Sequence, residues 1–131
     1  MNSGLEFHDS RVSSVQSAND VVIVIFESAY LHRSEGVPGG DKGTGWTQAG
    51  SLEFASAFLT STGDIGEGWI VEGCVSVDGA DEVRLIPVPF NVAGKVTASF
   101  TFNNGCVLQV RSESARLTLT GEARFVEDFP G

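Results

Sequence analysis

The chain contains two histidines, and both have carboxylates near them in the sequence. His8 is followed by Asp9, and His32 stands shortly before a glycine-rich segment that contains Asp41. Two imidazoles and one carboxylate oxygen, with one position left open, form a workable ligand set for a catalytic metal ion. His8, His32 and one carboxylate, Asp9 or Asp41, are therefore a candidate metal site. A small-molecule or metal-dependent enzyme with its site near His8 and His32 is the alternative function that these residues suggest.

A serine-based catalytic triad is a second chemistry to consider, because Ser10 follows His8 and Asp9 directly. Consecutive residues of an extended chain point to opposite faces, so these three residues alone do not form a triad. Short polar side chains at strand ends more often bond to the nearby backbone. We therefore expect no catalytic residue here.

Residues 29–50, AYLHRSEGVPGGDKGTGWTQAG, hold six of the sixteen glycines. A phosphate-binding Walker A loop requires GxxxxGK followed by Ser or Thr, but here Asp41 precedes Lys42 and Gly43 follows it. The dinucleotide motif GxGxxG fails as well, because Gln48 stands where the third glycine belongs. The segment is predicted to be neither a phosphate nor a dinucleotide site.

The same segment is a candidate binding loop, because a connection approaching about fifteen residues in a compact domain is usually functional. It carries the only tyrosine and one of the two tryptophans, and aromatic side chains with a polar group are enriched at binding surfaces. The leading hypothesis is a non-enzymatic interaction module that uses the loop at residues 30–50 to contact a protein partner. Its candidate binding residues are Tyr30, His32, Arg33, Asp41, Lys42 and Trp46.

The elements that must hold these residues read as β-strands. Residues 95–102 alternate between polar and apolar side chains, the two-residue period of a half-buried strand. Asn104-Gly105 then predicts a tight type I′ turn, with the returning strand facing inward through Cys106, Leu108 and Val110. Residues 17–20 predict a second hairpin, which leads into the apolar run VVIVIF at residues 21–26. Because this run is apolar at every position, we expect a central strand.

Three further runs, which begin near residues 51, 69 and 115, alternate in the same way. Pro87 and Pro89 remove two donors from any hydrogen-bond ladder, which favours an edge strand or a bend. We predict an all-β fold: one antiparallel sandwich or barrel of about eight or nine strands, with residues 1–131 in a single domain. The residues expected to face inward in the three runs are Leu52, Phe54 and Phe58; Trp69, Val71, Val75 and Val77; and Leu117, Leu119, Ala123 and Phe125.

Composition excludes several classes of partner. The formal net charge of −9 repels the phosphate backbone of nucleic acids. The longest apolar run is far shorter than a membrane span, and the first residues lack the basic and apolar segments of a leader, so we expect a cytoplasmic protein that does not bind membranes. Cys74 and Cys106 are expected as buried thiols, with a bridge between adjacent strands as the alternative. We expect no cofactor, and self-association through an open sheet edge is possible.

The opening LEFHDSRVSSV, residues 5–15, followed by a turn and a long apolar strand, resembles the start of several groups of small bacterial β proteins. These groups are uncharacterised or are described as immunity proteins of polymorphic toxin systems. The resemblance implies a β-rich protein that acts by stoichiometric binding, and it carries over no catalytic residue.

Overall fold

The computed structural model describes residues 1–63 and 67–130 and confirms the all-β prediction. All strands belong to one antiparallel sheet, whose neighbour order is β2-β3-β8-β7-β5-β1-β6, with β4 paired to β8. The strands in the described residues are β1 (Asn2–Ala18), β2 (Val21–Ser34), β3 (Gly43–Ala55), β4 (Phe58–Ser61), β5 (Gly68–Val77), β6 (Leu85–Val88), β7 (Asn91–Phe102) and β8 (Val107–Phe129).

The sheet closes on itself as a barrel-like ring. β1 pairs along most of its length with β2, and it also pairs with β5 through Arg11 opposite Trp69 and Val12 opposite Gly68. These two pairings join the ends of the path β2-β3-β8-β7-β5 through β1. The antiparallel sheet predicted as a sandwich or barrel is therefore closed into a ring. β6, which contains Pro87, lies at the end of the path and pairs only with β1 among the named strands, as the proline predicted for an edge.

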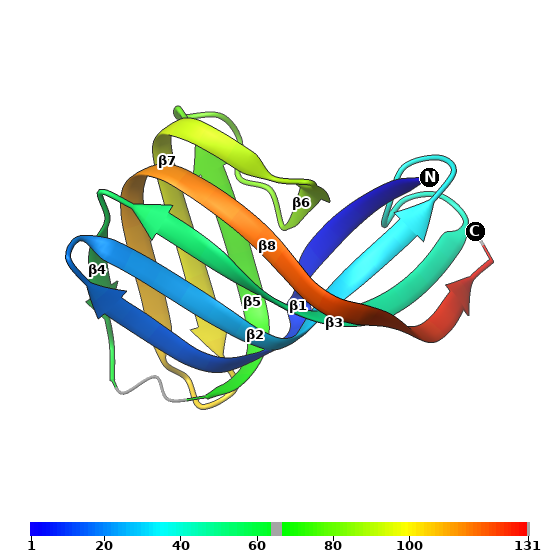
Figure 1. The fold of residues 1–131 in the computed structure, drawn as a ribbon, viewed down its shortest axis with the longest axis horizontal. Helices are drawn as coiled ribbons and strands as arrows, with labels where there is room; N and C mark the ends of the chain where they lie inside the picture. The colour runs from blue at the N-terminus through cyan, green and yellow to red at the C-terminus, as the bar shows by residue number, and fades with distance from the viewer. Residues whose placement is uncertain (64–66, 131) are drawn as a thin grey trace.

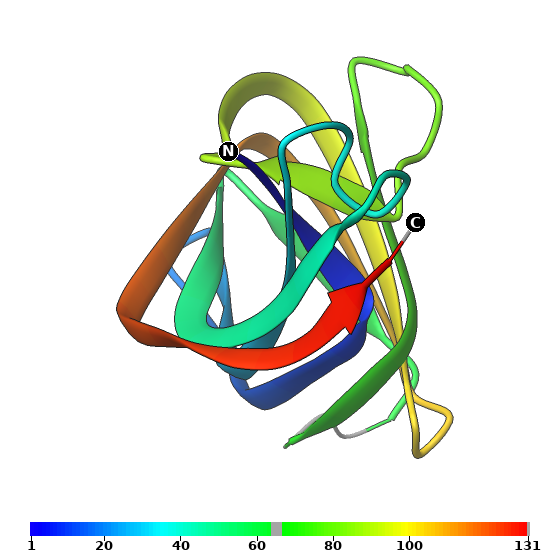
Figure 2. The same cartoon turned by 90° about the vertical axis from the view of Figure 1, so that its right-hand side faces the viewer.

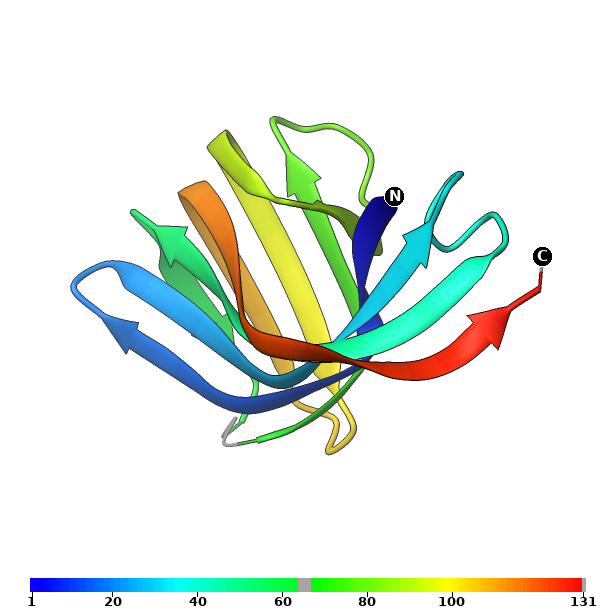
Figure 3. The ribbon, with the colours of Figure 1, turned by 45° about the vertical axis from the view of Figure 1, so that its right-hand side comes forward.

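Four long strands bend together and divide the molecule into two parts (Figures 1 and 3). We call the closed part the ring, and the extension formed by residues 2–9, 29–34, 43–48 and 121–129 the arm. The ladder between the parts is irregular in each strand pair: between Glu6 and Arg11, between Phe26 and Ala29, and between Thr47 and Ala49. A β-bulge bends its strand and increases its twist, so irregularities at one level turn all four strands.

The hydrophobic core fills the ring and continues to the base of the arm. Apolar side chains from β1, β2, β3, β7 and β8 point inward and are almost fully buried. The rings of Phe7 and Phe100 meet edge to face, with their centroids 5.0 Å apart. The largest fully buried side chains are Phe7, Phe26, Phe54, Phe100, Phe102, Leu5, Leu31, Leu52, Ile70, Ile86, Leu108 and Val12.

Both predicted hairpins form, with one change in a turn. Asn19 and Asp20 adopt positive φ angles of 53° and 63° between β1 and β2, as a tight primed turn requires. Between β7 and β8 only Gly105 has a positive φ, of 88°, and its N–H donates to the Phe102 carbonyl at 2.9 Å. The predicted two-residue type I′ turn is therefore wrong, and the strands are joined by a three-residue loop that ends in a left-handed glycine.

Four residues predicted to face inward are exposed, because the strands change phase. The ladder between β5 and β7 shifts between Ile70 and Glu72, so Ile70 and Val75 point inward while Trp69 and Val71 are 42% and 45% exposed.

Phe58 and Phe125, the two other residues predicted to face inward but found exposed, also follow a change of phase. Between β3 and β4, Ser56 has a positive φ of 49°, and Phe58 beyond it is exposed. In β8, Gly121 has a positive φ of 70°, and Phe125 is exposed on the arm. A one-residue change of phase moves a side chain to the other face of a strand.

Cys74 and Cys106 form no disulfide in the described residues. The Cys106 thiol is buried and donates to the Thr62 carbonyl oxygen at 3.0 Å. Cys74 was also predicted to be buried, but it is only partly buried. This partial burial, followed by the neighbouring carboxylate of Glu82, raises the pKa of the Cys74 thiol and so keeps it protonated and weakly nucleophilic. In addition, the part of the chain that the structure describes contains no helix of the length and hydrophobicity that a membrane span requires.

Candidate functional site

The glycine-rich segment is a β-hairpin with a short tip, not a long loop. β2 and β3 stay paired out to Ser34 and Gly43, so only residues 35–42 connect them. The predicted loop at residues 30–50 is therefore wrong at both ends. Gly43 permits the pairing, because a Cβ at this position would lie 2.0 Å from the Arg33 carbonyl oxygen. Gly43, one of the glycines that suggested a loop, therefore allows β2 and β3 to approach closely.

The tip at residues 35–42 is held by its own hydrogen bonds. The Asp41 carboxylate accepts the Val37 N–H at 2.6 Å, and the Asp41 N–H donates to the Val37 carbonyl at 2.8 Å. The Ser34 hydroxyl donates to the Lys42 carbonyl at 2.6 Å, and the Asn2 amide donates to the Gly36 carbonyl at 2.7 Å. These bonds fix the tip against the ends of β1 and β2.

The fixed tip presents an apolar side chain beside an apolar groove. Val37 is 63% exposed, and Met1, which lines the same groove, is 77% exposed. The groove has a volume of about 340 Å³, and we call it the arm-tip groove. It is lined by residues 1–3, by the tip and by β6, and Figure 2 shows these three segments close together. Its lining residues are Met1, Asn2, Ser3, Val37, Pro38, Leu85, Pro87 and Val88.

Two of the predicted binding residues contact each other elsewhere on the arm. The Arg33 guanidinium lies over the Trp46 ring, 4.4 Å from its centroid, and Phe125 meets the same ring edge to face at 5.5 Å. The Trp46 indole N–H donates to the Thr44 hydroxyl at 2.8 Å. Trp46 is partly buried by these contacts, so its main role is to pack β3 against β8.

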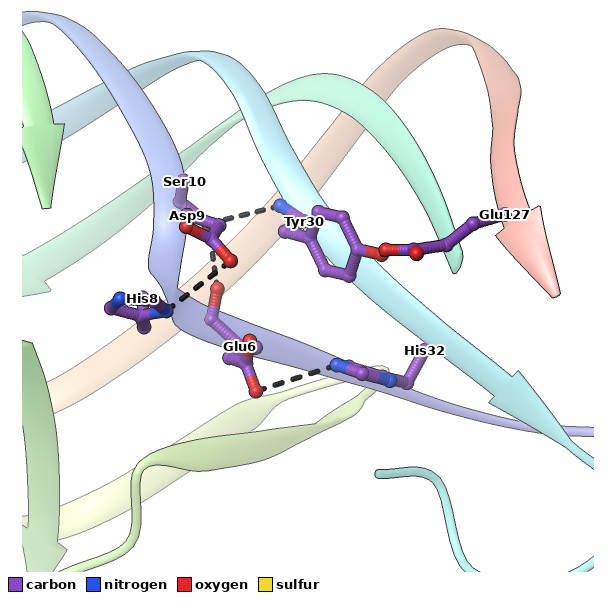
Figure 4. Close-up of polar contacts among 7 residues, drawn as sticks. All are labelled: Glu6, His8, Asp9, Ser10, Tyr30, His32 and Glu127. Atoms are coloured by element: carbon purple, nitrogen blue, oxygen red, sulfur yellow. Dashed lines mark hydrogen bonds and ion pairs between the residues drawn. The ribbon is translucent and has the colours of Figure 1, made fainter. Parts of the chain in front are cut away.

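Tyr30 and His32 are buried, so they cannot contact a partner as exposed side chains. The Tyr30 hydroxyl donates to the Glu127 carboxylate at 2.5 Å and ties β2 to the end of β8 (Figure 4). Burial, followed by the hydrogen bond to Glu127, raises the pKa of Tyr30 well above its usual value. This residue stabilises the arm that carries the tip.

The raised pKa of Tyr30 predicts a loss of stability at high pH. The unfolded chain releases the phenolic proton near pH 10, while the folded chain still holds it. The contribution of Tyr30 to the free energy of unfolding is therefore complete below about pH 10 and falls above it, by at most about 1.4 kcal/mol per pH unit. In Tyr30→Phe this part of the alkaline loss should disappear.

Tyr30 is the only tyrosine, so its ionisation in the folded protein can be followed by ultraviolet absorbance. Denaturant unfolding of wild type and Tyr30→Phe at a series of pH values would measure the linked stability. Ionisation of the folded protein at the ordinary pKa of tyrosine would contradict the buried hydrogen bond.

A left-handed residue in β1 brings His8 and Asp9 to the same side. Asp9 has a positive φ of 70°, and its carboxylate Oδ2 lies 3.2 Å from His8 Nδ1. Ser10 turns inward instead and is fully buried, where its hydroxyl donates to the Glu6 carbonyl at 2.7 Å and accepts the Tyr30 N–H at 2.9 Å. These three residues therefore form no serine triad, because the hydroxyl holds the backbone of the bulge.

His32 lies across from this bulge with an unusual environment. It is 8% exposed and stacks on Phe129, with ring centroids 4.9 Å apart. Its Nε2 is 3.4 Å from the Glu6 carboxylate Oε2, close enough for a charge interaction. The atoms are not aligned as a hydrogen bond, and Nε2 has no hydrogen-bond partner among the described residues. Figure 4 shows Glu6 between His32 and the His8–Asp9 pair.

The structure therefore separates the two groups of predicted site residues. Asp41 and Lys42 belong to the tip, whereas His8 and Asp9 lie at the bulge. Glu6, Glu127 and Phe129 were not predicted, although Glu6 and His8 are two positions apart and so share a strand face. No pattern in the sequence indicates Glu127 and Phe129, because the pairing of β3 with β8 brings them to Tyr30 and His32 from far along the chain.

A second and larger groove lies at the bend, with a volume of about 560 Å³. Its Arg11 guanidinium lies over the Trp69 ring and forms ion pairs with Glu27 at 2.6 Å and Glu67 at 3.4 Å. Because these carboxylates offset its charge, Arg11 stabilises the closure of β1 against β5 and is poorly suited to bind an anion.

Comparisons with protein-family models, with curated proteins and with solved structures find no match for this chain. The chemistry of the arm tip and of the β1 bulge is therefore inferred from the residues found there.

Proposed function

We propose that this protein is a non-enzymatic binding protein that contacts a protein partner with the arm-tip groove and the tip at residues 35–42. One observation carries the proposal: an exposed Val37 stands beside an apolar groove, on a tip whose conformation is already fixed by hydrogen bonds. A preorganised surface binds more tightly, because less conformational freedom is lost on association.

The chemistry of the groove and the charge of the chain suggest the kind of partner. The lining side chains Met1, Val37, Pro38, Leu85 and Val88 suit an apolar anchor, the usual centre of an energetically important contact. The net charge of −9 favours a basic protein and predicts that association slows as salt is raised. Resemblance of residues 5–15 to immunity-like proteins favours the same mode of action, stoichiometric binding.

This proposal changes the set of contact residues. The buried Tyr30 and His32 support the arm, and the exposed Met1, Val37 and Lys42 are offered to the partner. Asp41 acts on the partner indirectly, because its carboxylate holds the backbone of Val37.

Capture from a lysate of the source organism tests the proposal. Immobilised wild type should retain a specific protein that Val37→Asp loses, because a carboxylate would be buried against an apolar anchor. The matched control is Val71→Asp, the same change at an exposed valine of β5 in the ring. Equal retention of the same protein by wild type and Val37→Asp would refute this use of the tip.

A further inference from the structure

A separate cluster at the bulge of β1 has the composition of a metal site. One ligand atom from each of Glu6, His8 and Asp9 can be chosen so that all lie within 4.8 Å of one another. We propose that these three residues bind a divalent transition-metal ion such as Zn²⁺, and that His32 positions the Glu6 carboxylate. This inference is independent of partner binding at the arm tip.

The backbone creates the cluster. Glu6 and His8 share one face of β1 because they are two positions apart, but Asp9 would point the other way in a regular strand. The positive φ of Asp9 returns its carboxylate to the face of His8. Ser10 and the backbone of Tyr30 and Glu6 hold this conformation through the two hydrogen bonds of the buried hydroxyl.

The spacing of the ligand atoms suits a small ion. Zn²⁺ binds nitrogen and oxygen ligands at about 2.0–2.1 Å, so two ligands of a tetrahedral ion lie about 3.3 Å apart. The distance of 3.2 Å between His8 Nδ1 and Asp9 Oδ2 matches that edge. The Glu6 carboxylate lies within 4.8 Å of the other two ligand atoms, and its side chain is 32% exposed, so it has room to rotate toward the third position.

His32 supplies the second, independent observation. Its Nε2 is buried, has no hydrogen-bond partner among residues 1–63 and 67–130, and points at the Glu6 carboxylate. Ligating carboxylates are commonly oriented by hydrogen bonds from residues behind them. A Glu6 carboxylate held by the ion would be the nearest acceptor for Nε2, whose lack of a hydrogen-bond partner otherwise costs free energy.

The donor set decides the class of ion. An imidazole with two carboxylates suits Zn²⁺ and its neighbours in the first transition series, whereas Ca²⁺ prefers six to eight oxygen ligands. His8 and Asp9 are 60% and 61% exposed at their side chains, so an ion can reach them from solvent. Three protein ligands would leave a coordination position for water, as in catalytic zinc sites. The predicted set of His8, Asp9 and His32 is thus replaced by Glu6, His8 and Asp9.

Isothermal titration of the chelator-treated full chain with ZnCl₂ tests the inference. We expect one ion per chain, and at least a tenfold loss of affinity in His8→Ala and in Glu6→Gln. His8 is exposed, so its variant should fold normally, which circular dichroism would check. The matched control for Glu6→Gln is Glu113→Gln, an exposed glutamate of β8, which should bind as wild type does.

The role of His32 has its own measurement. His32→Gln should weaken Zn²⁺ binding about 10- to 100-fold, as expected for a residue that orients a ligand. Unchanged affinity in His32→Gln would overturn its positioning role. The site itself would be overturned if wild type binds no Zn²⁺, if His8→Ala binds as tightly as wild type, or if CaCl₂ binds as tightly as ZnCl₂.

Discussion

Replacing Phe100 by alanine is expected to lower the free energy of unfolding by about 3–5 kcal/mol. Phe100 is fully buried, and its phenyl group packs edge to face against that of Phe7 in the hydrophobic core inside the closed sheet. The surrounding packing is tight, because a Cβ at Gly73 would lie 2.7 Å from Phe7 Cβ and 2.9 Å from Phe100 Cδ1. The surrounding strands should prevent the core from collapsing into the cavity that the lost phenyl group leaves.

Urea unfolding followed by tryptophan fluorescence measures this loss. Phe58→Ala is the matched control, because Phe58 is 69% exposed and the same change there should alter stability by no more than about 0.5 kcal/mol. Equal losses in the two variants would mean that the ring core is not where the structure places it.

Replacing Gly43 by alanine is expected to lower the free energy of unfolding by roughly 1–3 kcal/mol and to abolish partner capture. The added Cβ would lie 2.0 Å from the Arg33 carbonyl oxygen and 3.1 Å from Ser34 Cβ. Both belong to the strand that pairs with Gly43, so β2 and β3 must separate where they meet the tip. Val37 would then lose its fixed presentation.

Gly40→Ala is the control within the same tip. A Cβ at Gly40 would meet Val37 at 3.5 Å, an ordinary contact, so stability and capture should stay close to wild type. Thermal unfolding and the capture assay, applied to both variants, separate the two positions. A Gly43→Ala protein that still captures the partner would show that binding does not depend on the geometry of the tip.

The alternation of apolar residues predicted the strands and much of the core. It succeeds in β7, where Val96, Ala98, Phe100 and Phe102 are all buried as expected. It fails where a strand changes phase, as at the bulge after Ile70 that leaves Trp69 exposed. A bulge depends on the pairing of two strands distant in sequence, so one strand's pattern does not reveal it.

The candidate sites were harder to predict for the same reason. The glycine-rich composition suggested a long binding loop, but a neighbouring backbone approaches Gly43 closely and leaves no room for a side chain there. His8 and Asp9 were expected to diverge, and the positive φ of Asp9 brings them together. The grouping of the candidate residues in space depends on backbone angles and on the bend of four strands, which the sequence pattern does not reveal.

The bend links the two proposed sites to one structural feature. The proposed metal ligands Glu6, His8 and Asp9 lie at the bulge of β1, and the arm that begins there leads to the tip and the arm-tip groove. Because the two sites use different residues, His8→Ala tests Zn²⁺ binding and Val37→Asp tests partner capture, and each result can be interpreted without the other.

The most direct test of the proposed function is a titration of the purified captured partner into wild type, Val37→Asp and Val71→Asp. We predict one partner per chain, a dissociation constant at least tenfold higher for Val37→Asp, which is about 1.4 kcal/mol, and an unchanged constant for Val71→Asp. Equal affinity of all three proteins for the partner would contradict the account of the arm tip as the binding surface.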